Sequence, residues 1–450
     1  MVEIILKVLH DPARQRIVAR PMGACSAPVS RHFSTRPTRG QSMLVRTEPN
    51  TVGMSAERLR RIDGWMQGYV DSGRLPGCLT AVTRKGRIAY LGCAGMADPQ
   101  SGRPVAEDTV FRIFSMTKPI VTAAAMTFYE EGRFQLDDPI TRFLPEFRDT
   151  PVHVSGEGDA MKTEPVATPV KVWQLMTHTS GLVYGDRTAS PVGTLYQQAG
   201  ANFSRRNDAV LADVVRLVAA IPLHAQPGTS WEYSVATDVL GRMVEVLGGK
   251  PLNEILQERI FGPLGMDETA FQVRTDQLPR LAALFNAKNG GTEQIDPADQ
   301  GSSWARPVTL FSGGGGLVST VGDYLRFAEA MRRKGELDGA RILGRRTVEL
   351  MALNHLPGNV DLTAMGQPVF SETSFDGIGF GLGFSVVMDS AATKGACSVG
   401  ELAWGGAAST AFWIDPVEEV SVVFMTQVMP SSSYPIRREL RALVYQSLVD

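Results

Sequence analysis

The sequence predicts an α+β fold in which strands from both ends of the chain share one antiparallel sheet. Segments typical of strands, apolar and bounded by turn residues, occur between residues 78 and 91 and again after residue 379. Segments with helical spacing of apolar residues fill the middle of the chain. This order predicts packed layers of helix and sheet, with the C-terminal third completing the sheet.

The first elements are a helix and a hairpin. Ser55 can cap a helix whose apolar positions recur at helical spacing and which ends near Gly73. Cys78–Val82 and Arg87–Leu91 follow as two strands joined by a short turn, which predicts an antiparallel hairpin.

The remaining elements follow the same patterns. Helices are expected at Val210–Ala220, Val235–Leu247, Asn253–Ile260 and Ile436–Leu448, and strands at Gly379–Met388, Ala411–Ile414 and Ser421–Val428. Two stretches rich in Gly, Pro and Asp, Lys288–Val308 and Pro357–Gly377, are expected to be long loops, and such loops often wall a site.

The composition excludes several classes of function. The 450 residues include 45 basic and 47 acidic ones, so the net charge of −2 predicts no nucleic-acid partner and no anionic membrane partner. No apolar run is long enough to span a bilayer. The four cysteines and six histidines show no metal-site spacing, and no nucleotide-binding glycine motif occurs. We therefore expect no metal and no cofactor, and we interpret the cysteines as small buried hydrophobic residues.

The chain divides into an extension and a catalytic region. Residues 1–50 are basic and rich in Ser and Pro, which predicts a disordered leader or extension; an organellar transit peptide is the alternative. Residues 51–450 are expected to fold, with sheet-containing parts at about 51–130 and 310–450 and a mainly helical part at 131–309. We expect a cytoplasmic protein, and no oligomeric state is predicted.

The segment Ser115-Met-Thr-Lys118 is a candidate for nucleophilic chemistry. Pro119 fits only the first turn of a helix, so Ser115 should lie at the start of the apolar helix that follows and ends at Gly132. Lys118 is one turn away on the same face, and burial can depress its pKa. The pair is a candidate nucleophile with an adjacent base. Chance occurrence of the Ser-x-x-Lys pair is the alternative.

Tyr233 is the second candidate. It stands in Pro227-Gly-Thr-Ser-Trp-Glu-Tyr-Ser, just before the helix expected from Val235. A phenol becomes a useful base when a neighbouring cation lowers its pKa, and Lys118 could supply that charge. A buried tyrosine with a satisfied hydroxyl is the alternative.

The third candidate is Trp404-Gly405-Gly406-Ala407, directly before a predicted strand. Two glycines let another chain or a ligand approach the backbone closely, and free N–H groups there could help to form an oxyanion hole. A β-bulge with a packed tryptophan is the alternative.

In this order, the three motifs resemble those of the serine β-lactamases and penicillin-binding proteins, and most closely those of family VIII carboxylesterases, the esterase branch related to class C β-lactamases. The resemblance extends from about Met54 to the C-terminus, and further matching blocks are His178-Thr-Ser-Gly-Leu182, Ser312-Gly-Gly-Gly-Gly-Leu-Val-Ser-Thr320, Tyr324-Leu-Arg-Phe and Phe412-Trp-Ile-Asp-Pro416. It implies a β-lactamase/DD-peptidase-like fold, with a central antiparallel sheet flanked by helices and a mainly helical domain.

The resemblance also implies roles for residues. Ser115 would be the acylated nucleophile, and Lys118 and Tyr233 would share the work of the base, with either of them deprotonating Ser115. The backbone N–H groups of Ser115 and Ala407 would form the oxyanion hole, and Trp404 would line the pocket with Gly405 and Gly406.

Two departures from the β-lactamase pattern bear on the substrate. Trp404 stands where those enzymes have the lysine of Lys-Thr-Gly, and Val235 stands where they commonly have an asparagine. A site without these polar groups favours a neutral, mostly apolar small-molecule ester. The resemblance implies a carboxylesterase for short-chain acyl esters, with weak cephalosporin hydrolysis in some members. A β-lactamase or D-alanyl-D-alanine peptidase, and an acyltransferase, are the alternatives.

Overall fold

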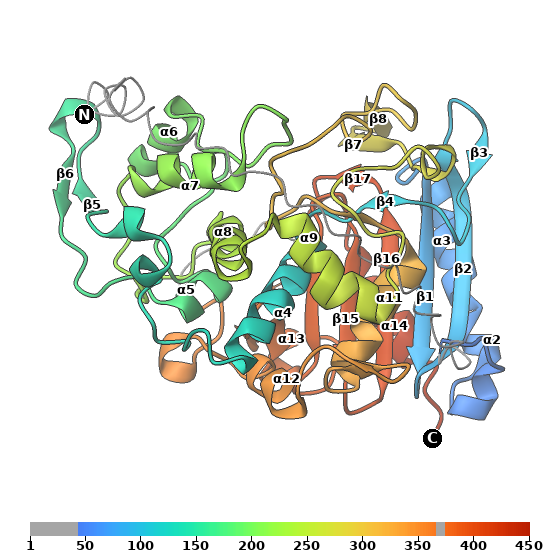
Figure 1. Ribbon diagram of the computed structural model, residues 1–450. Coiled ribbons are helices and arrows are strands. Elements are labelled where there is room, and N and C mark those ends of the chain that lie inside the picture. The colour runs from blue at the N-terminus through green and yellow to red at the C-terminus, as the bar shows by residue number, and fades with distance from the viewer. Residues whose placement is uncertain (1–43, 366–373) are drawn as a thin grey trace, which may run out of the picture.

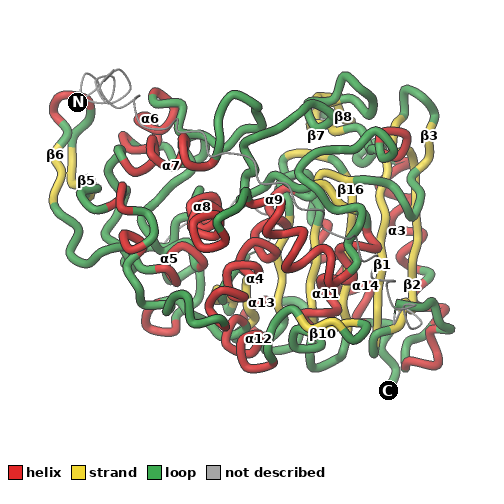
Figure 2. Tube along the Cα trace, in the orientation of Figure 1, coloured by secondary structure: helices red, strands yellow, loops and turns green. Residues whose placement is uncertain are grey.

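The computed structural model describes residues 44–365 and 374–450, and its centre is an eight-stranded antiparallel sheet (Figures 1 and 2). In spatial order its strands are β12 (Ile378–Phe380), β13 (Ser385–Val387), β14 (Leu402–Gly405), β15 (Ala411–Asp415), β16 (Val420–Thr426), β1 (Gly77–Arg84), β2 (Arg87–Asp98) and β3 (Arg103–Pro104). Because β1 pairs with β2 on one side and with β16 on the other, the two ends of the chain share the sheet. The predicted α+β class is confirmed.

Both faces of the sheet are buried, and the alternation of side chains along each strand explains how. Val423 and Met425 of β16 belong to one hydrophobic cluster, whereas Val422 and Phe424 belong to another. Since neighbouring residues of a strand point to opposite faces, each cluster lies on its own side of the sheet. The sheet is therefore the middle layer of the molecule.

Helices form the two outer layers. α3 contacts β2 and packs with α2 and α14 in one cluster, while α11 contacts β15 and β16 from the opposite side and joins α4 in the other. Figure 1 shows α5, α6 and α7 farther from the sheet, on the left. The α-helices are α2 (Ala56–Leu59), α3 (Arg61–Asp71), α4 (Thr117–Glu130), α5 (Val172–Met176), α6 (Pro191–Gln198), α7 (Leu211–Ala219), α8 (Ala236–Gly248), α9 (Leu252–Leu256), α10 (Gly262–Leu264), α11 (Val321–Arg332), α12 (Arg345–Met351), α13 (Ser390–Thr393) and α14 (Ile436–Tyr445).

Short strand pairs lie outside the main sheet. They bring distant segments together, and the pairing of β4 with β9 places the chain that leads into α4 beside the chain that leads into α11. The short strands are β4 (Phe111–Arg112) and β9 (Val318–Ser319), β5 (Val152–Ser155) and β6 (Lys162–Glu164), β7 (Leu284–Lys288) with β8 (Gly291–Asp296) and β17 (Val428–Met429), and β10 (Glu336–Leu337) and β11 (Ala340–Arg341).

Most predicted elements lie where the sequence analysis expects them. The hydroxyl of Ser55 accepts a 3.3 Å hydrogen bond from the backbone of Arg58 and so caps α2, but the helix breaks at Arg60 before α3 begins. The predicted helices at 210–220 and 235–247 are α7 and α8. The one expected at 253–260 is α9 followed by a π-helical turn, Gln257–Phe261.

Two expectations are wrong. Gly379–Met388 is not one strand but the β12–β13 hairpin, because the chain turns at Gly383, whose φ of +88° favours glycine. Lys288–Val308 is not a loop throughout, since its first residues form the turn and strand β8 of the β7–β8 hairpin. Its polar residues alternate on an exposed hairpin, and such a pattern lacks the apolar signal of a buried strand.

Part of the expected loop and leader falls on residues that are not described. Of Pro357–Gly377, residues 366–373 lie outside the described part, and the rest contains the 3-10 turn Pro357–Asn359. Residues 1–43 likewise lie outside it, whereas 44–50 run beside β2, with Thr47 N–H donating to Ile88 carbonyl at 3.0 Å.

The cysteines are less buried than the sequence analysis expects. Cys78 is buried, but Cys93 is exposed and Cys397 is half-buried. Cys93 is exposed because β2 lies near the edge of the sheet, where one face of the strand reaches solvent. Within residues 44–365 and 374–450, no helix combines the length and apolar character that crossing a bilayer requires.

Candidate active site

Ser115 lies at the entrance to α4, as the sequence predicts. The chain leaves β4, passes through the 3-10 turn η3 (Phe114–Met116) and enters α4, with Pro119 in its first turn. The hydroxyl of Tyr324 donates a 2.9 Å hydrogen bond to the carbonyl of Met116 and fixes this turn. Ser115 is therefore held beside the N-terminus of a buried helix, where backbone N–H groups favour developing negative charge.

Lys118 is buried beneath Ser115, with 1% of its surface exposed. Its Nζ donates to Ser115 Oγ at 3.3 Å, to the Tyr184 hydroxyl at 3.1 Å and to the Gly314 carbonyl at 2.6 Å. An ammonium has three protons to donate, and acceptors for them surround Lys118. The structure thus brings the predicted serine and lysine into direct contact.

The pKa of Lys118 differs from the sequence expectation. Burial on its own lowers this pKa, as expected, but Tyr184, Tyr233 and Asp238 outweigh burial by favouring the charged form. The pKa of Lys118 is therefore raised above its ordinary value rather than depressed. Lys118 remains an ammonium at neutral pH.

Tyr233 lies beside Lys118, immediately before α8. The Lys118 Nζ is 4.6 Å from the centroid of its ring, and the indole N–H of Trp404 donates to its hydroxyl at 3.3 Å. The ring of His178 lies 4.8 Å from that of Tyr233, and burial together with Lys118 holds the pKa of His178 well below its usual range. The phenol thus has a cation and a neutral imidazole as neighbours.

Asp238, in the first turn of α8, holds the glycine-rich segment against the site. Its Oδ1 accepts from Ser312 Oγ at 2.6 Å and from Gly314 N–H at 2.9 Å. Its Oδ2 is buried without a hydrogen-bond partner, and burial raises the pKa of the carboxyl. A Cβ on Gly314 would lie 2.4 Å from that Oδ2 and 3.0 Å from the Tyr184 hydroxyl, so only glycine fits.

The end of β14 comes close to the turn that carries Ser115. A Cβ on Gly406 would lie 2.5 Å from the carbonyl oxygen of Ile113, and one on Gly405 would lie 2.6 Å from the Arg437 guanidinium. The two glycines therefore let neighbouring groups come close to the backbone. Because Gly406 lies against Ile113, the next residue, Ala407, lies close to Ser115.

Ser115 opens into a cavity of about 620 Å³. Of the predicted site residues, Val235 and Ala407 line this cavity with Ser115, while Lys118 and Tyr233 lie behind it. Trp404, Gly405 and Gly406 line a different cavity, next to α13 and α14, so their role in binding substrate stays a prediction. The cavity at Ser115 is also lined by Phe114, Tyr184, Tyr196, Phe203, Arg205, Asp238, Trp304, Leu310 and Met429.

The sequence analysis missed three residues of the site: Tyr184, Asp238 and Trp304. Tyr184 follows the block His178–Leu182 by two residues, and Asp238 is an acidic residue on the buried side of a predicted helix, so both carried a weak signal. Trp304 lies in a stretch expected to be a loop that walls a site. Among the described residues no group of three or more His, Cys, Asp or Glu could hold a metal ion.

The arrangement suits nucleophilic acyl chemistry. A serine hydroxyl at a helix start contacts an ammonium, a phenol ring lies beside that ammonium, and Ser115 and Ala407, from two distant segments, line one cavity. These are the parts needed for attack on a carbonyl carbon, for proton transfer and for stabilising an oxyanion.

Comparison with known proteins identifies relatives over most of the chain. A family model described as Beta-lactamase matches residues 62–446. Protein Rv1367c of Mycobacterium tuberculosis is 35% identical over 367 residues, 81% of this chain and 88% of its own. Esterase EstB of Burkholderia gladioli is 32% identical over 417 residues, 88% and 98% of the two chains. The structure of EstCE1, described as a hydrolase with promiscuous acyltransferase activity, matches with a TM-score of 0.74 and 30% identity over 86% and 99% of the two chains.

Proposed function

The chain belongs to the beta-lactamase family, on its family VIII esterase branch, and from this premise we propose that it is a serine carboxylesterase that forms an acyl-enzyme. The observation that carries the proposal is the contact of Ser115 Oγ with the Lys118 ammonium at 3.3 Å, beside Tyr233. The substrate would be a small-molecule ester with a short acyl chain. From the sequence alone we expect that the enzyme acts in the cytoplasm without a cofactor.

In the proposed acylation step, Ser115 Oγ attacks the carbonyl carbon while its proton passes to Tyr233, which acts as the general base. The bond between the carbonyl carbon and the alcohol oxygen breaks, and Tyr233 returns the proton to the leaving oxygen. Water then attacks the acyl-enzyme with the same help. The sequence leaves the choice of base open, and the raised pKa of Lys118 favours Tyr233, since Lys118 then supplies a fixed positive charge.

The oxyanion of the tetrahedral intermediate would accept hydrogen bonds from the N–H groups of Ser115 and Ala407. Two facts support this assignment. Both residues line one cavity, and the close passage of Gly406 at Ile113 brings their backbones together. The N-terminus of α4 adds a favourable dipole at the same point.

A neutral ester is the proposed substrate because two positions that hold polar groups in β-lactamases do not offer them to a substrate here. The indole of Trp404 stands where β-lactamases have a lysine, and its N–H is already bonded to Tyr233. Val235 lines the cavity with an apolar side chain. A β-lactamase activity should accordingly be weak.

The experiment is a comparison of turnover on p-nitrophenyl butyrate and on a chromogenic cephalosporin. We expect fast ester cleavage and slow or absent lactam opening. Ser115→Ala should lose about three orders of magnitude or more in kcat with unchanged circular dichroism. Lactam turnover equal to ester turnover would contradict the proposal, and so would full activity of Ser115→Ala.

An acyltransferase is the second candidate, because EstCE1 is described as a hydrolase with promiscuous acyltransferase activity. In that case an alcohol takes the place of water in the second step. Adding a short alcohol to the ester assay and measuring the new ester against free acid distinguishes the two. A majority of transfer product in dilute alcohol would favour the acyltransferase.

A further inference from the structure

Trp304 lies on the wall of the cavity that contains Ser115, in the stretch between β8 and α11. Only 8% of its surface is exposed. Part of its ring packs in a small hydrophobic cluster with Val110 and Leu281, and part faces the cavity. A bulky aromatic ring at this place bears directly on the space available to a bound ester.

The ring of Trp304 is also in contact with the residue before the candidate nucleophile. The rings of Phe114 and Trp304 meet edge to face, with centroids 5.6 Å apart. Phe114 has φ +44°, a left-handed conformation that is costly for a bulky residue and persists only where the surroundings hold it. Trp304 is one of the neighbours that hold it.

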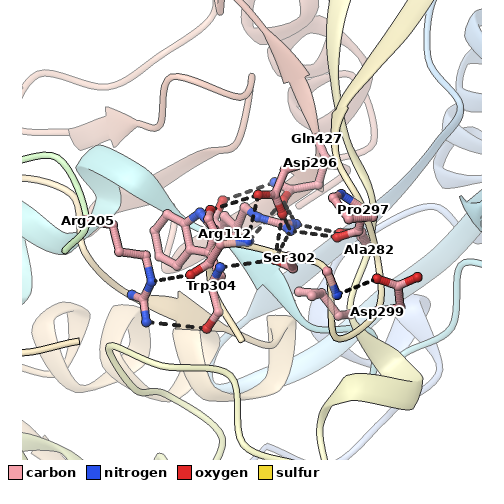
Figure 3. A network of polar contacts seen from close by, with 12 residues as sticks. Arg112, Arg205, Ala282, Asp296, Pro297, Asp299, Ser302, Trp304 and Gln427 are labelled. Carbon is pink, nitrogen blue, oxygen red and sulfur yellow. Dashed lines mark hydrogen bonds and ion pairs between the residues drawn. The ribbon is translucent and has the colours of Figure 1, made fainter. Parts of the chain in front are cut away.

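A buried ion pair anchors the loop that carries Trp304 (Figure 3). Arg112 of β4 is fully buried and pairs with Asp296 at the end of β8. It also donates to Pro297 carbonyl at 3.1 Å and to Ser302 Oγ at 3.0 Å. These contacts join the loop, at Asp296, Pro297 and Ser302, to β4, the strand that leads to Ser115. A buried arginine that loses its partner is costly, so this anchor is firm.

Arg205 fastens the same loop from the helical side of the cavity. Its guanidinium lies 5.1 Å from the centroid of the Trp304 ring. It donates to the backbone carbonyls of Ser303 at 2.8 Å, Trp304 at 3.3 Å and Arg306 at 3.0 Å. Figure 3 shows Arg112 and Arg205 on either side of Trp304. The backbone of the loop is thus fastened by two arginines, and the indole ring of Trp304 lies near both guanidinium groups.

We propose that Trp304 sets the upper size limit of the ester group that binds in the cavity beside Ser115, with Arg112 and Arg205 as positioning residues that hold Trp304 there. This inference rests on the proposed esterase function. It assigns substrate specificity to a residue outside the serine, lysine and tyrosine motifs. The physical reason is that a rigid, anchored indole cannot yield to a larger group, whereas a smaller side chain leaves that space open.

The experiment measures kcat/KM over two series of esters in the full-length protein. One series lengthens the acyl chain from p-nitrophenyl acetate through butyrate to octanoate, and the other enlarges the alcohol of an acetate ester. In one of the two series, Trp304→Ala should raise the ratio of kcat/KM for the largest ester to kcat/KM for the smallest ester by about tenfold or more. Trp304→Phe should raise it less, and Arg205→Met, which keeps an apolar stem but loses the donors, should act in the same direction.

Trp65→Ala is the matched control, because Trp65 is a partly buried tryptophan on α3, across the sheet from the site. It should leave both ratios unchanged. If the wild type cleaves esters but neither Trp304 variant changes a ratio, the size-limit inference is wrong while the esterase function stands. If the wild type cleaves no ester in either series, the proposed function fails and the inference fails with it.

Discussion

Asp238 links the glycine-rich segment to the charge on Lys118. One carboxylate oxygen holds Ser312 and Gly314, and the carbonyl of the same Gly314 accepts from the lysine. The other oxygen is buried without a partner. A buried acidic group in this state is costly and persists when it serves the site.

Two replacements of Asp238 separate the effect of its charge from the effect of its hydrogen bonds. Asp238→Asn keeps an oxygen that accepts from Ser312 and Gly314 but removes the negative charge. The pKa of Lys118 should therefore fall, and kcat/KM on p-nitrophenyl butyrate should drop about tenfold. Asp238→Ala leaves both donors buried and unsatisfied, which should cost about 1–3 kcal/mol each. Thermal melts and kinetics of both variants are the measurement. Asp276→Asn, an exposed aspartate, is the control, and wild-type kinetics in Asp238→Asn would contradict the prediction.

Glu232, the residue before Tyr233, should make the stability of the folded protein depend on pH. Burial raises its pKa from 4.5 to about 7, and the nearest partner is His224, whose Nε2 lies 3.9 Å from the carboxylate. Burial, and then His153, lowers the pKa of His224, so it gives little positive charge at neutral pH. Since the folded state disfavours the carboxylate form, Glu232 stabilises the protein below pH 4.5 and this stability is lost as pH rises through 7.

Glu232→Gln should remove that loss. Its unfolding midpoint should exceed that of the wild type at pH 8 by about 2 °C or more and should approach it at pH 5. Midpoints measured at pH 5, 6, 7 and 8 test this, with the exposed Glu157→Gln as the control. A constant difference across this range would show that Glu232 does not titrate within it.

The candidate site could be predicted from the sequence only where local motifs mark it. Ser115 and Lys118 share a helical turn with a proline that fixes the register, Tyr233 follows a Pro-Gly turn, and Ala407 follows two glycines. Tyr184, Asp238 and Trp304 have no such signal, because tertiary packing alone brings their segments to Ser115. The raised pKa of Lys118 could not be predicted for the same reason, since its causes lie on two other segments.

At the scale of elements, the important contact is between the end of β14 and the turn before α4. A Cβ on Gly406 would lie 2.5 Å from the Ile113 carbonyl and 2.3 Å from Thr410 Oγ1. Contacts under 3 Å force a shift, and backbone cannot give way easily. The position of Ala407 relative to Ser115 therefore depends on glycine at 406.

Gly406→Ala should push the end of β14 away from the turn. We expect kcat on p-nitrophenyl butyrate to fall by about tenfold to a hundredfold, with a stability loss of about 1–3 kcal/mol from overpacking. Gly64→Ala on α3 is the matched control, because no atom lies within 4 Å of the added Cβ and alanine favours a helix. Unchanged kcat in Gly406→Ala would mean that this approach does not place the oxyanion donors.

Elements were predicted well where apolar spacing is continuous and poorly where a turn interrupts it. The helices α7 and α8 match because their apolar stripes are regular. The hairpin of β12 and β13 reads as one strand, since Gly381 and Gly383 stand in an otherwise apolar run. The hairpin of β7 and β8 is expected from the sequence to be a loop, since Ile295 is the single large apolar residue of β8.

At the scale of the whole molecule, the segment around Gly53 and Ser55 is joined to the C-terminal residues. Ser55 N–H donates to Ser447 carbonyl at 2.7 Å and Val449 N–H to Gly53 carbonyl at 3.1 Å. Asp450 pairs with Arg84 at 2.6 Å. β1 lies between β2 and β16 near the centre of the sheet. If the C-terminal part unfolds, β1 loses its partner β16, and if the N-terminal part unfolds, β16 loses its partner β1.

Leu440 of α14 tests whether the sheet and the site unfold together. It is fully buried in the cluster on the side of α3, across the sheet from α4 and Ser115. Leu440→Ala should lower the free energy of unfolding by about 2–5 kcal/mol, because a cavity remains where the side chain packed. Since Leu440 packs in the cluster on the opposite side of the sheet from Ser115, kcat and KM at 25 °C should stay at wild-type values while the folded fraction remains high.

The measurement is urea unfolding followed in parallel by far-UV circular dichroism and by residual esterase activity. If the sheet and the site unfold as one cooperative unit, the circular dichroism curve and the activity curve should coincide in the wild type and shift together in Leu440→Ala. Leu353→Ala, whose side chain is 58% exposed, should shift neither. Loss of activity well before loss of circular dichroism would instead show that the segments around Ser115 open independently of the sheet.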